Sequence, residues 1–226
     1  MARRILIAES VTPDQDRLTL TFENGHHVVR VRDEVLMSRR VSGSEEAMAA
    51  LALSDLAPGS DARVLIGGLG MGFTLRAVLA ELGSAAQVHV SELLEPIIDW
   101  NHGPLGCHAG RPLDDPRVEI LVGDVMTHLA AAVQAYDAIV LDIDNGPEAF
   151  TVAGNNRLYA PSGLAMVHAA LRAGGVMVLW SAFRSGSFER RLRAAGFSAT
   201  SVTVRARGAV AKGARHTLFR AKRLRA

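Results

Sequence analysis

A glycine-rich run in the first half of the chain constrains the fold most. The run from Val64 to Gly72 reads VLIGGLGMG. Its three apolar residues predict a short buried strand, and the glycines then let the backbone turn sharply and approach a ligand closely. Phe73 to Leu82 has the apolar spacing of a helix, which Gly83 would end. A strand, a glycine turn and a helix in this order are typical of open parallel α/β sheets, where the helix N-terminus offers unpaired N–H groups.

An acidic residue follows this run at a suitable distance. Gln87 to Val90 predicts the next strand, and Glu92 lies 20 residues beyond Gly72. An acidic side chain at this place accepts hydrogen bonds from the ribose hydroxyls of a nucleoside. Glycines in tight strand–helix turns also serve packing alone, but the acid in register with the second strand favours binding. The predicted nucleoside-binding residues are Gly67, Gly68, Gly70, Gly72 and Glu92.

Two more predicted strands extend this site. Arg117 to Val122 is followed closely by Asp124, and Tyr136 to Leu141 is followed directly by Asp142. Ligands of open parallel sheets bind beyond the carboxyl ends of the strands, so Glu92, Asp124 and Asp142 should converge on one rim. Asp124 suits the amino group of an adenine, and it equally suits the N-cap of the following helix. The two roles are compatible.

The ordered motifs resemble the spermidine synthase family. They are Ile66-Gly67-Gly68-x-Gly70-x-Gly72, then V-x-V-x-E ending at Glu92, then Gly123-Asp124, then Y-D-x-I-x-x-D ending at Asp142. The segment from Ser38 to Ala47 also looks like the one that leads into that family's domain. The resemblance implies the Rossmann-like fold of class I S-adenosylmethionine-dependent methyltransferases: a mostly parallel seven-stranded sheet with helices on both faces. It also implies a thioether nucleoside cofactor, with Glu92 on its ribose, Asp124 on its adenine and Asp142 near the reacting centre.

Two departures from the family pattern concern the substrate. Gly70 stands where aminopropyltransferases of the family carry an Asp for the amino group of decarboxylated S-adenosylmethionine. The family's D-S-S-D-P loop is here Asp142-Ile143-Asp144-Asn145-Gly146, so Asp142 matches the catalytic Asp while the second acid moves to Asp144. This chain therefore has fewer acidic residues for binding a cationic polyamine than the family pattern has. A loop of bare N–H groups suits a cofactor that keeps its carboxylate. We therefore expect a methyltransferase that uses S-adenosylmethionine on a small molecule, with Asp142 and Asp144 as catalytic residues.

Two other functions stay open. One is a polyamine aminopropyltransferase that uses decarboxylated S-adenosylmethionine, and the other is a non-catalytic nucleoside-binding protein. If the acceptor is an amine, Asp142 and Asp144 should anchor it as a cation. The loop around these acids also has the Asp, Asn, Gly and Pro composition of an ordinary turn, so a purely structural role is the alternative.

Composition and hairpin signals complete the expected organisation. Residues 1–40 should form a small antiparallel β region, with a hairpin turn at Asn24-Gly25, and residues 41–226 the Rossmann-like catalytic domain. No apolar run reaches the ~18 residues of a membrane span, and we expect a cytoplasmic protein with no membrane partner. The single cysteine, Cys107, excludes an intramolecular disulfide, and it forms no metal-binding set with the nearby His102 and His108.

Charge is distributed unevenly along the chain. The net charge is +2, yet residues 172–226 hold thirteen Lys or Arg and a single acid, Glu189. A basic segment of this kind is one signature of a nucleic-acid interface. Aromatic residues for base stacking are few in it, so we favour a solvated or intramolecularly paired basic surface over a nucleic-acid partner. A homodimer is compatible with the sequence.

Overall fold

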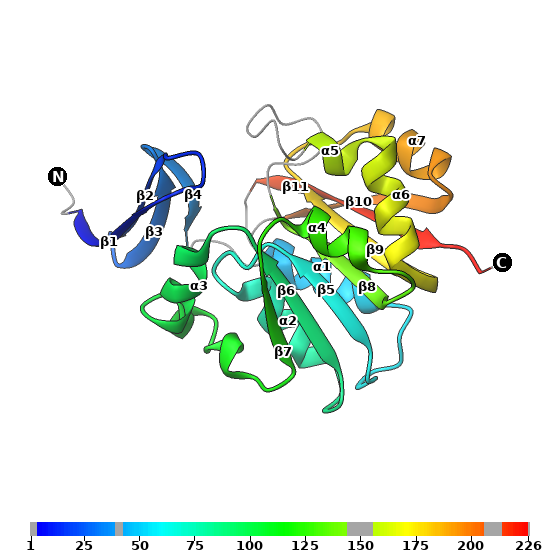
Figure 1. Cartoon of the computed structure of the whole chain (residues 1–226), viewed down its shortest axis with the longest axis horizontal. Helices are drawn as coiled ribbons and strands as arrows, with labels where there is room; N and C mark the ends of the chain where they lie inside the picture. The colour runs from blue at the N-terminus through cyan, green and yellow to red at the C-terminus, as the bar shows by residue number, and fades with distance from the viewer. Residues whose placement is uncertain (1–3, 39–42, 144–155, 206–213, 226) are drawn as a thin grey trace.

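The computed structural model describes residues 4–38, 43–143, 156–205 and 214–225 and contains two sheets (Figure 1). The smaller sheet is antiparallel, with strands in the order β1-β2-β3-β4. Its strands are β1 (Ile5–Val11), β2 (Arg17–Glu23), β3 (His26–Val31) and β4 (Glu34–Ser38). The hairpin turn predicted at Asn24-Gly25 joins β2 and β3, whereas no sequence signal indicated β4. The turn before β4 is Arg32-Asp33, in which Arg32 has a φ of 55° without any glycine or proline to signal the turn.

The larger sheet has seven strands in the order β10-β11-β9-β8-β5-β6-β7. Strands β5 to β9 run parallel to one another, and at one edge β11 pairs antiparallel with both β9 and β10. This arrangement confirms the predicted Rossmann-like fold with its small antiparallel β appendage. The strands are β5 (Arg63–Gly67), β6 (Gln87–Glu92), β7 (Val118–Val122), β8 (Tyr136–Leu141), β9 (Leu171–Ser181), β10 (Phe197–Arg205) and β11 (Arg215–Arg223).

Helices cover both faces of the larger sheet because its central strands are apolar on both sides. Along β5, Val64 and Ile66 pack in one core cluster with α1 and α2, whereas Leu65 packs in a second cluster with α4, α6 and α7. The helices are α1 (Gly43–Leu53), α2 (Phe73–Glu81), α3 (Glu95–His102), α4 (Val125–Ala131), α5 (Asn156–Tyr159), α6 (Pro161–Ala170) and α7 (Gly186–Ala194). Two short 3₁₀ helices, η1 (Gly106–His108) and η2 (Pro112–Asp114), follow α3.

The small sheet shares its apolar core with the larger domain. Leu18, Leu20 and Val29 lie in the same buried cluster as Leu105, which precedes η1. His27 Nδ1 lies 2.6 Å from His108 Nε2, so β3 also touches η1 through polar atoms. Figure 1 shows the small sheet beside α3. The small sheet ends at residue 38 and α1 begins at residue 43. A domain division at residues 40 and 41 remains our proposal.

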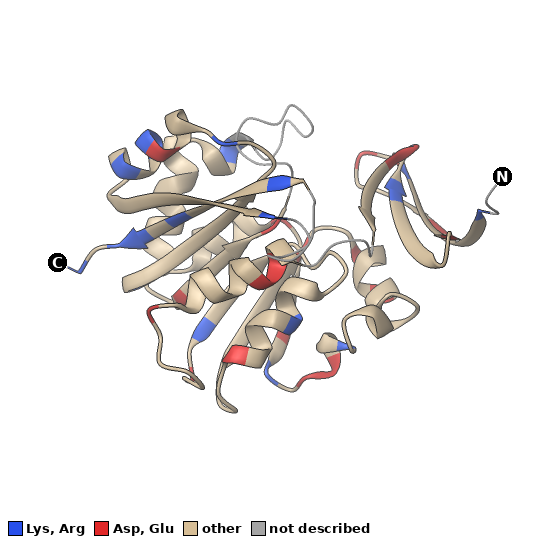
Figure 2. Ribbon diagram, turned by 180° about the vertical axis from the view of Figure 1, so that it is seen from behind, with Lys and Arg blue, Asp and Glu red and all other residues tan. Residues whose placement is uncertain are grey.

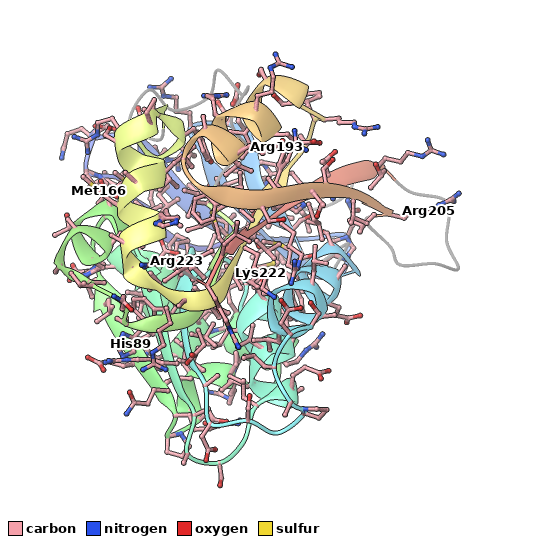
Figure 3. The ribbon with its side chains drawn as sticks, turned by 90° about the vertical axis from the view of Figure 1, so that its right-hand side faces the viewer. His89, Met166, Arg193, Arg205, Lys222 and Arg223 are labelled. Carbon is pink, nitrogen blue, oxygen red and sulfur yellow. The ribbon has the colours of Figure 1, made fainter. Side chains whose placement is uncertain are left out.

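Basic side chains of the C-terminal part are largely paired within the molecule. Arg220 Nη2 and Lys222 Nζ each lie 2.7 Å from Asp55 Oδ2, and Arg193 pairs with Glu189 on α7. Arg223 Nη1 donates to the Leu171 carbonyl at 2.6 Å. Figure 2 shows the remaining basic residues spread over α7 and β11, and Figure 3 shows Arg205 directed away from the domain. In the described ranges, no helix combines the length and apolar character needed to cross a bilayer.

Candidate functional site

Two of the loop glycines are required by close packing. Gly68 has a φ of +88°, and a Cβ atom there would lie 2.3 Å from the carbonyl oxygen of Asp142. Gly72 has a φ of +80°, and its Cβ atom would lie 2.9 Å from Cγ of Pro112. L-residues with side chains rarely adopt these backbone angles. The packing interpretation of the glycines is therefore correct at both positions, and it is compatible with ligand binding by the same loop.

Gly70 differs from both of these glycines. Its φ is +54°, but a Cβ atom at this position would have no neighbour within 4 Å among the described residues. The carbonyl oxygen of Gly70 accepts a hydrogen bond of 2.9 Å from Asn101 Nδ2, and Asn101 is 2% exposed. Sequence reasoning missed Asn101 because it lies within an apolar helical stretch. The loop is thus held from α3 while leaving open space where the family carries an Asp.

Glu92 occupies the end of β6 and lies against the glycine loop. Its side chain is 8% exposed, and its two carboxylate oxygens accept hydrogen bonds of 2.9 Å from the N–H groups of Leu69 and Leu94. Burial raises the pKa of this carboxyl, and the backbone donors act in the opposite direction. The backbone N–H groups of Gly70 and Leu93 also interact with this carboxylate. A carboxylate has about four acceptor sites, so ribose hydroxyls would share them with these backbone donors.

Asp142 lies on the other side of β5. Its N–H donates to the carbonyl oxygen of Gly67 at 2.9 Å, which continues the β5–β8 pairing into the loop. Asp142 Oδ2 accepts a hydrogen bond of 3.1 Å from the hydroxyl of Thr74, in the first turn of α2. Burial raises the pKa of the Asp142 carboxyl, partly offset by the Thr74 hydroxyl. Asp144 lies outside the described residues.

Asp124 serves as the N-cap of α4. Its Oδ1 accepts a hydrogen bond of 2.9 Å from the N–H of Met126, and its Oδ2 lies 3.4 Å from Arg157 Nη2. The capping interpretation is confirmed, while contact with an adenine remains a proposal. The N–H of Gly123 donates to the carbonyl of Glu92 at 2.8 Å, so Asp124 follows Glu92 along the same rim.

The order of the strands brings most of the predicted residues together. β6 and β8 flank β5, and all three are parallel, so Glu92 and Asp142 lie on opposite sides of the glycine loop at the carboxyl ends of the strands. The structure brings to this rim Gly67, Gly68, Gly70, Gly72, Glu92, Asp124 and Asp142. Figure 1 shows β5, β6 and β8 side by side in the sheet. A nucleoside on Glu92 would therefore lie across the loop from Asp142.

Glu45 is a further acid that sequence reasoning did not assign to the site. It lies in the first turn of α1, is half-buried, and accepts a hydrogen bond of 2.7 Å from the hydroxyl of Ser44. Burial and then the charge of Asp142 raise the pKa of Glu45 to about 7. In the sequence, Ser42-Gly43-Ser44-Glu45 has the pattern of a capping box, which accounts for a Glu here without any ligand.

Comparisons with known proteins point to polyamine synthesis. Residues 43–188 match the family model of the spermine/spermidine synthase domain. A polyamine aminopropyltransferase of Korarchaeum cryptofilum is 32% identical over 119 residues, 53% of this chain and 35% of that protein. Polyamine aminopropyltransferase 1 of Streptomyces coelicolor is 27% identical over 164 residues, 65% of this chain and 28% of that protein. The matched segments thus span about a third of the length of these relatives.

Solved structures show the same fold. A spermidine synthase in complex with the transition-state analogue AdoDATO superposes with a TM-score of 0.75 at 17% identity, covering 96% of this chain and 73% of that one. The spermidine synthase of Thermotoga maritima gives a TM-score of 0.70 at 16% identity, covering 96% and 72%.

These findings overturn one expectation from the sequence. The prediction of a methyltransferase acting on a small molecule is wrong, since the matching family model and the curated relatives all concern polyamine aminopropyl transfer. That prediction depended on the missing carboxylate at Gly70. A single loop position does not fix the charge of the site, because Glu45 reaches it from α1. The family model covers well over half of the chain, and with the site geometry it shows that this protein belongs to the spermine/spermidine synthase domain family.

Proposed function

We propose that this protein is an aminopropyltransferase that uses decarboxylated S-adenosylmethionine and a small aliphatic amine. Family membership supports the reaction class. The observation that carries the proposal is the position of Glu92 and Asp142 on the two sides of the glycine loop. One acid would bind the ribose at the end of β6, and the other lies where an acceptor amine would meet the reacting carbon.

The residues present fit the nucleoside of this cosubstrate. Glu92 would accept hydrogen bonds from the ribose hydroxyls, sharing its acceptor sites with the backbone N–H groups around its carboxylate. Asp124 would accept a hydrogen bond from the adenine amino group in place of its 3.4 Å contact with Arg157. Gly70 leaves room for the aminopropyl chain, because no described atom lies within 4 Å of its Cβ position.

The chemistry is a displacement at carbon, for which the cosubstrate supplies the activated sulfonium. The amine nitrogen forms a bond to the aminopropyl carbon, the carbon–sulfur bond breaks, and 5′-methylthioadenosine and a proton are released. The rate of such a step depends on alignment and on an unprotonated nucleophile. Asp142, held by Thr74, would orient the amine and accept its proton, and the raised pKa of its carboxyl suits that role. Asp144 is a further catalytic candidate from the sequence.

Product analysis tests the proposal directly. The full chain is incubated with an aliphatic diamine and either decarboxylated S-adenosylmethionine or S-adenosylmethionine, and the nucleoside products are separated by liquid chromatography with mass spectrometry. We expect 5′-methylthioadenosine together with an aminopropylated amine, and only with the decarboxylated cosubstrate. Formation of S-adenosylhomocysteine, or no product from either cosubstrate, would contradict it.

A further inference from the structure

The N-termini of two helices meet at Asp142. Thr74 in the first turn of α2 donates its hydroxyl to Asp142, and Arg76, two residues further along α2, lies 3.3 Å from Glu46 in the first turn of α1. The first turns of α1 and α2 therefore lie side by side at the carboxyl end of β8. Glu45 precedes Glu46 in that turn, but it is half-buried, whereas the Glu46 side chain is 60% exposed.

This placement creates a pair of acids without a cation. Among the described residues, neither Glu45 nor Asp142 takes part in a salt bridge, and each instead accepts a hydrogen bond from one hydroxyl, of Ser44 and Thr74 respectively. Two neighbouring carboxyls are unfavourable as anions, so the charge of one raises the pKa of the other or the pair recruits a positive charge. The charge of Asp142 contributes in this way to the raised pKa of Glu45.

The position of the pair matches what an amine acceptor needs. It lies on the β8 side of the glycine loop, opposite the Glu92 side on which the nucleoside is proposed to bind. The loop itself offers no carboxylate, because position 70 is a glycine. A protonated amino group bound between Glu45 and Asp142 would neutralise both acids at once, and such charge-assisted hydrogen bonds are the stronger kind.

We propose that Glu45 is an acceptor-binding residue, which together with Asp142 holds a cationic amino group of the acceptor substrate. This inference rests on the proposed function for its substrate class, an aliphatic diamine or polyamine. Glu45 therefore sets amine affinity rather than nucleoside affinity.

Matched variants on one helical turn test the inference. Glu45→Gln keeps the shape and removes the charge, and Glu46→Gln is its control, because Glu46 faces solvent and Arg76. Calorimetry measures binding of 1,4-diaminobutane to the full chain saturated with 5′-methylthioadenosine. We expect Glu45→Gln to weaken diamine binding by about tenfold or more, the effect of losing a hydrogen bond to a charged group, and Glu46→Gln to change it by less than about twofold. Affinity for 5′-methylthioadenosine should stay unchanged in both, which shows that the variants are folded.

Kinetics add a second measurement. In steady-state assays the loss in Glu45→Gln should appear in the KM for the diamine and not in kcat. Equal effects of Glu45→Gln and Glu46→Gln, or a diamine that does not bind to the unmodified chain, would overturn the inference. Diamine binding that depends on Glu45 without any aminopropyl transfer would uphold the inference and refute the proposed function.

Discussion

Replacing Glu45 by Gln should stabilise the fold in the absence of ligand, by an amount that depends on pH. The pKa of Glu45 rises from 4.5 to about 7 in the folded protein because of burial and the charge of Asp142. Below pH 4.5 the group is protonated in both states. Between pH 4.5 and about 7 the unfolded chain loses this proton first, so the folded state binds more protons and its stability falls as the pH rises. At about 1.36 kcal/mol for each pKa unit, the cost above pH 7 reaches at most about 3 kcal/mol.

Urea denaturation followed by circular dichroism at several pH values between 4 and 8 measures this cost. The unfolding free energy of Glu45→Gln relative to the unmodified chain should be nearly constant below pH 4.5 and should increase in favour of the variant up to about pH 7. Glu46→Gln is the control, since its side chain is exposed and pairs with Arg76. Equal differences at pH 4 and pH 8 would refute the raised pKa of Glu45 in the folded protein.

Three further predictions concern the glycine loop and its acids. Glu92→Gln should raise the dissociation constant of 5′-methylthioadenosine by about tenfold or more, since hydrogen bonds to a charged carboxylate are worth about 1.5–3 kcal/mol; unchanged affinity in calorimetry would remove Glu92 from the site. Asp142→Asn should lower turnover by ~10²–10⁴-fold, the range for a positioned acid–base group, with nearly level nucleoside affinity. A normal rate would show that the loop at Asp142 has a structural role only. Gly72→Ala should destabilise the fold by about 1–2 kcal/mol for the left-handed backbone alone, and by more through contact with Pro112, as measured by urea denaturation. Gly70→Ala lacks that contact, so an equal loss in both variants would contradict the packing argument.

The central sheet could be predicted from the sequence because its signals are local. Apolar runs closed by glycine or an acidic residue mark β5, β6 and β8, and the structure places each within a few residues of the prediction. Pro161 divides α5 from α6, because proline is favoured at the start of a helix. The end of α6 was less clear. Its apolar spacing continues to Leu171, but that residue begins β9 because it pairs with Tyr136 of the neighbouring strand.

The polar part of the site could be predicted only in part. Glu92 and Asp142 follow directly from strand ends, whose positions in a parallel sheet are fixed by the topology. Asn101 and Thr74 reach the site from within helices, and no sequence spacing relates them to Gly70 or Asp142. Contacts of this kind depend on how the helices pack against the sheet and against one another, which a sequence pattern does not show. The inference from position 70 alone therefore gave the wrong transferred group, a methyl group.

The core shared by the two sheets links ligand binding to the N-terminal strands. A four-stranded sheet of this size buries too little apolar surface to be stable alone. Its stability therefore depends on the packing of Leu18 and Leu20 in the core shared with the larger domain. The segment that contacts this sheet comes directly after α3 in the chain. Asn101, near the end of α3, holds the glycine loop by a hydrogen bond. Local opening of β2 and β3 should therefore release the loop as well. A nucleoside bound at the loop should slow hydrogen–deuterium exchange of the β2 and β3 amides, although the ligand would touch neither strand.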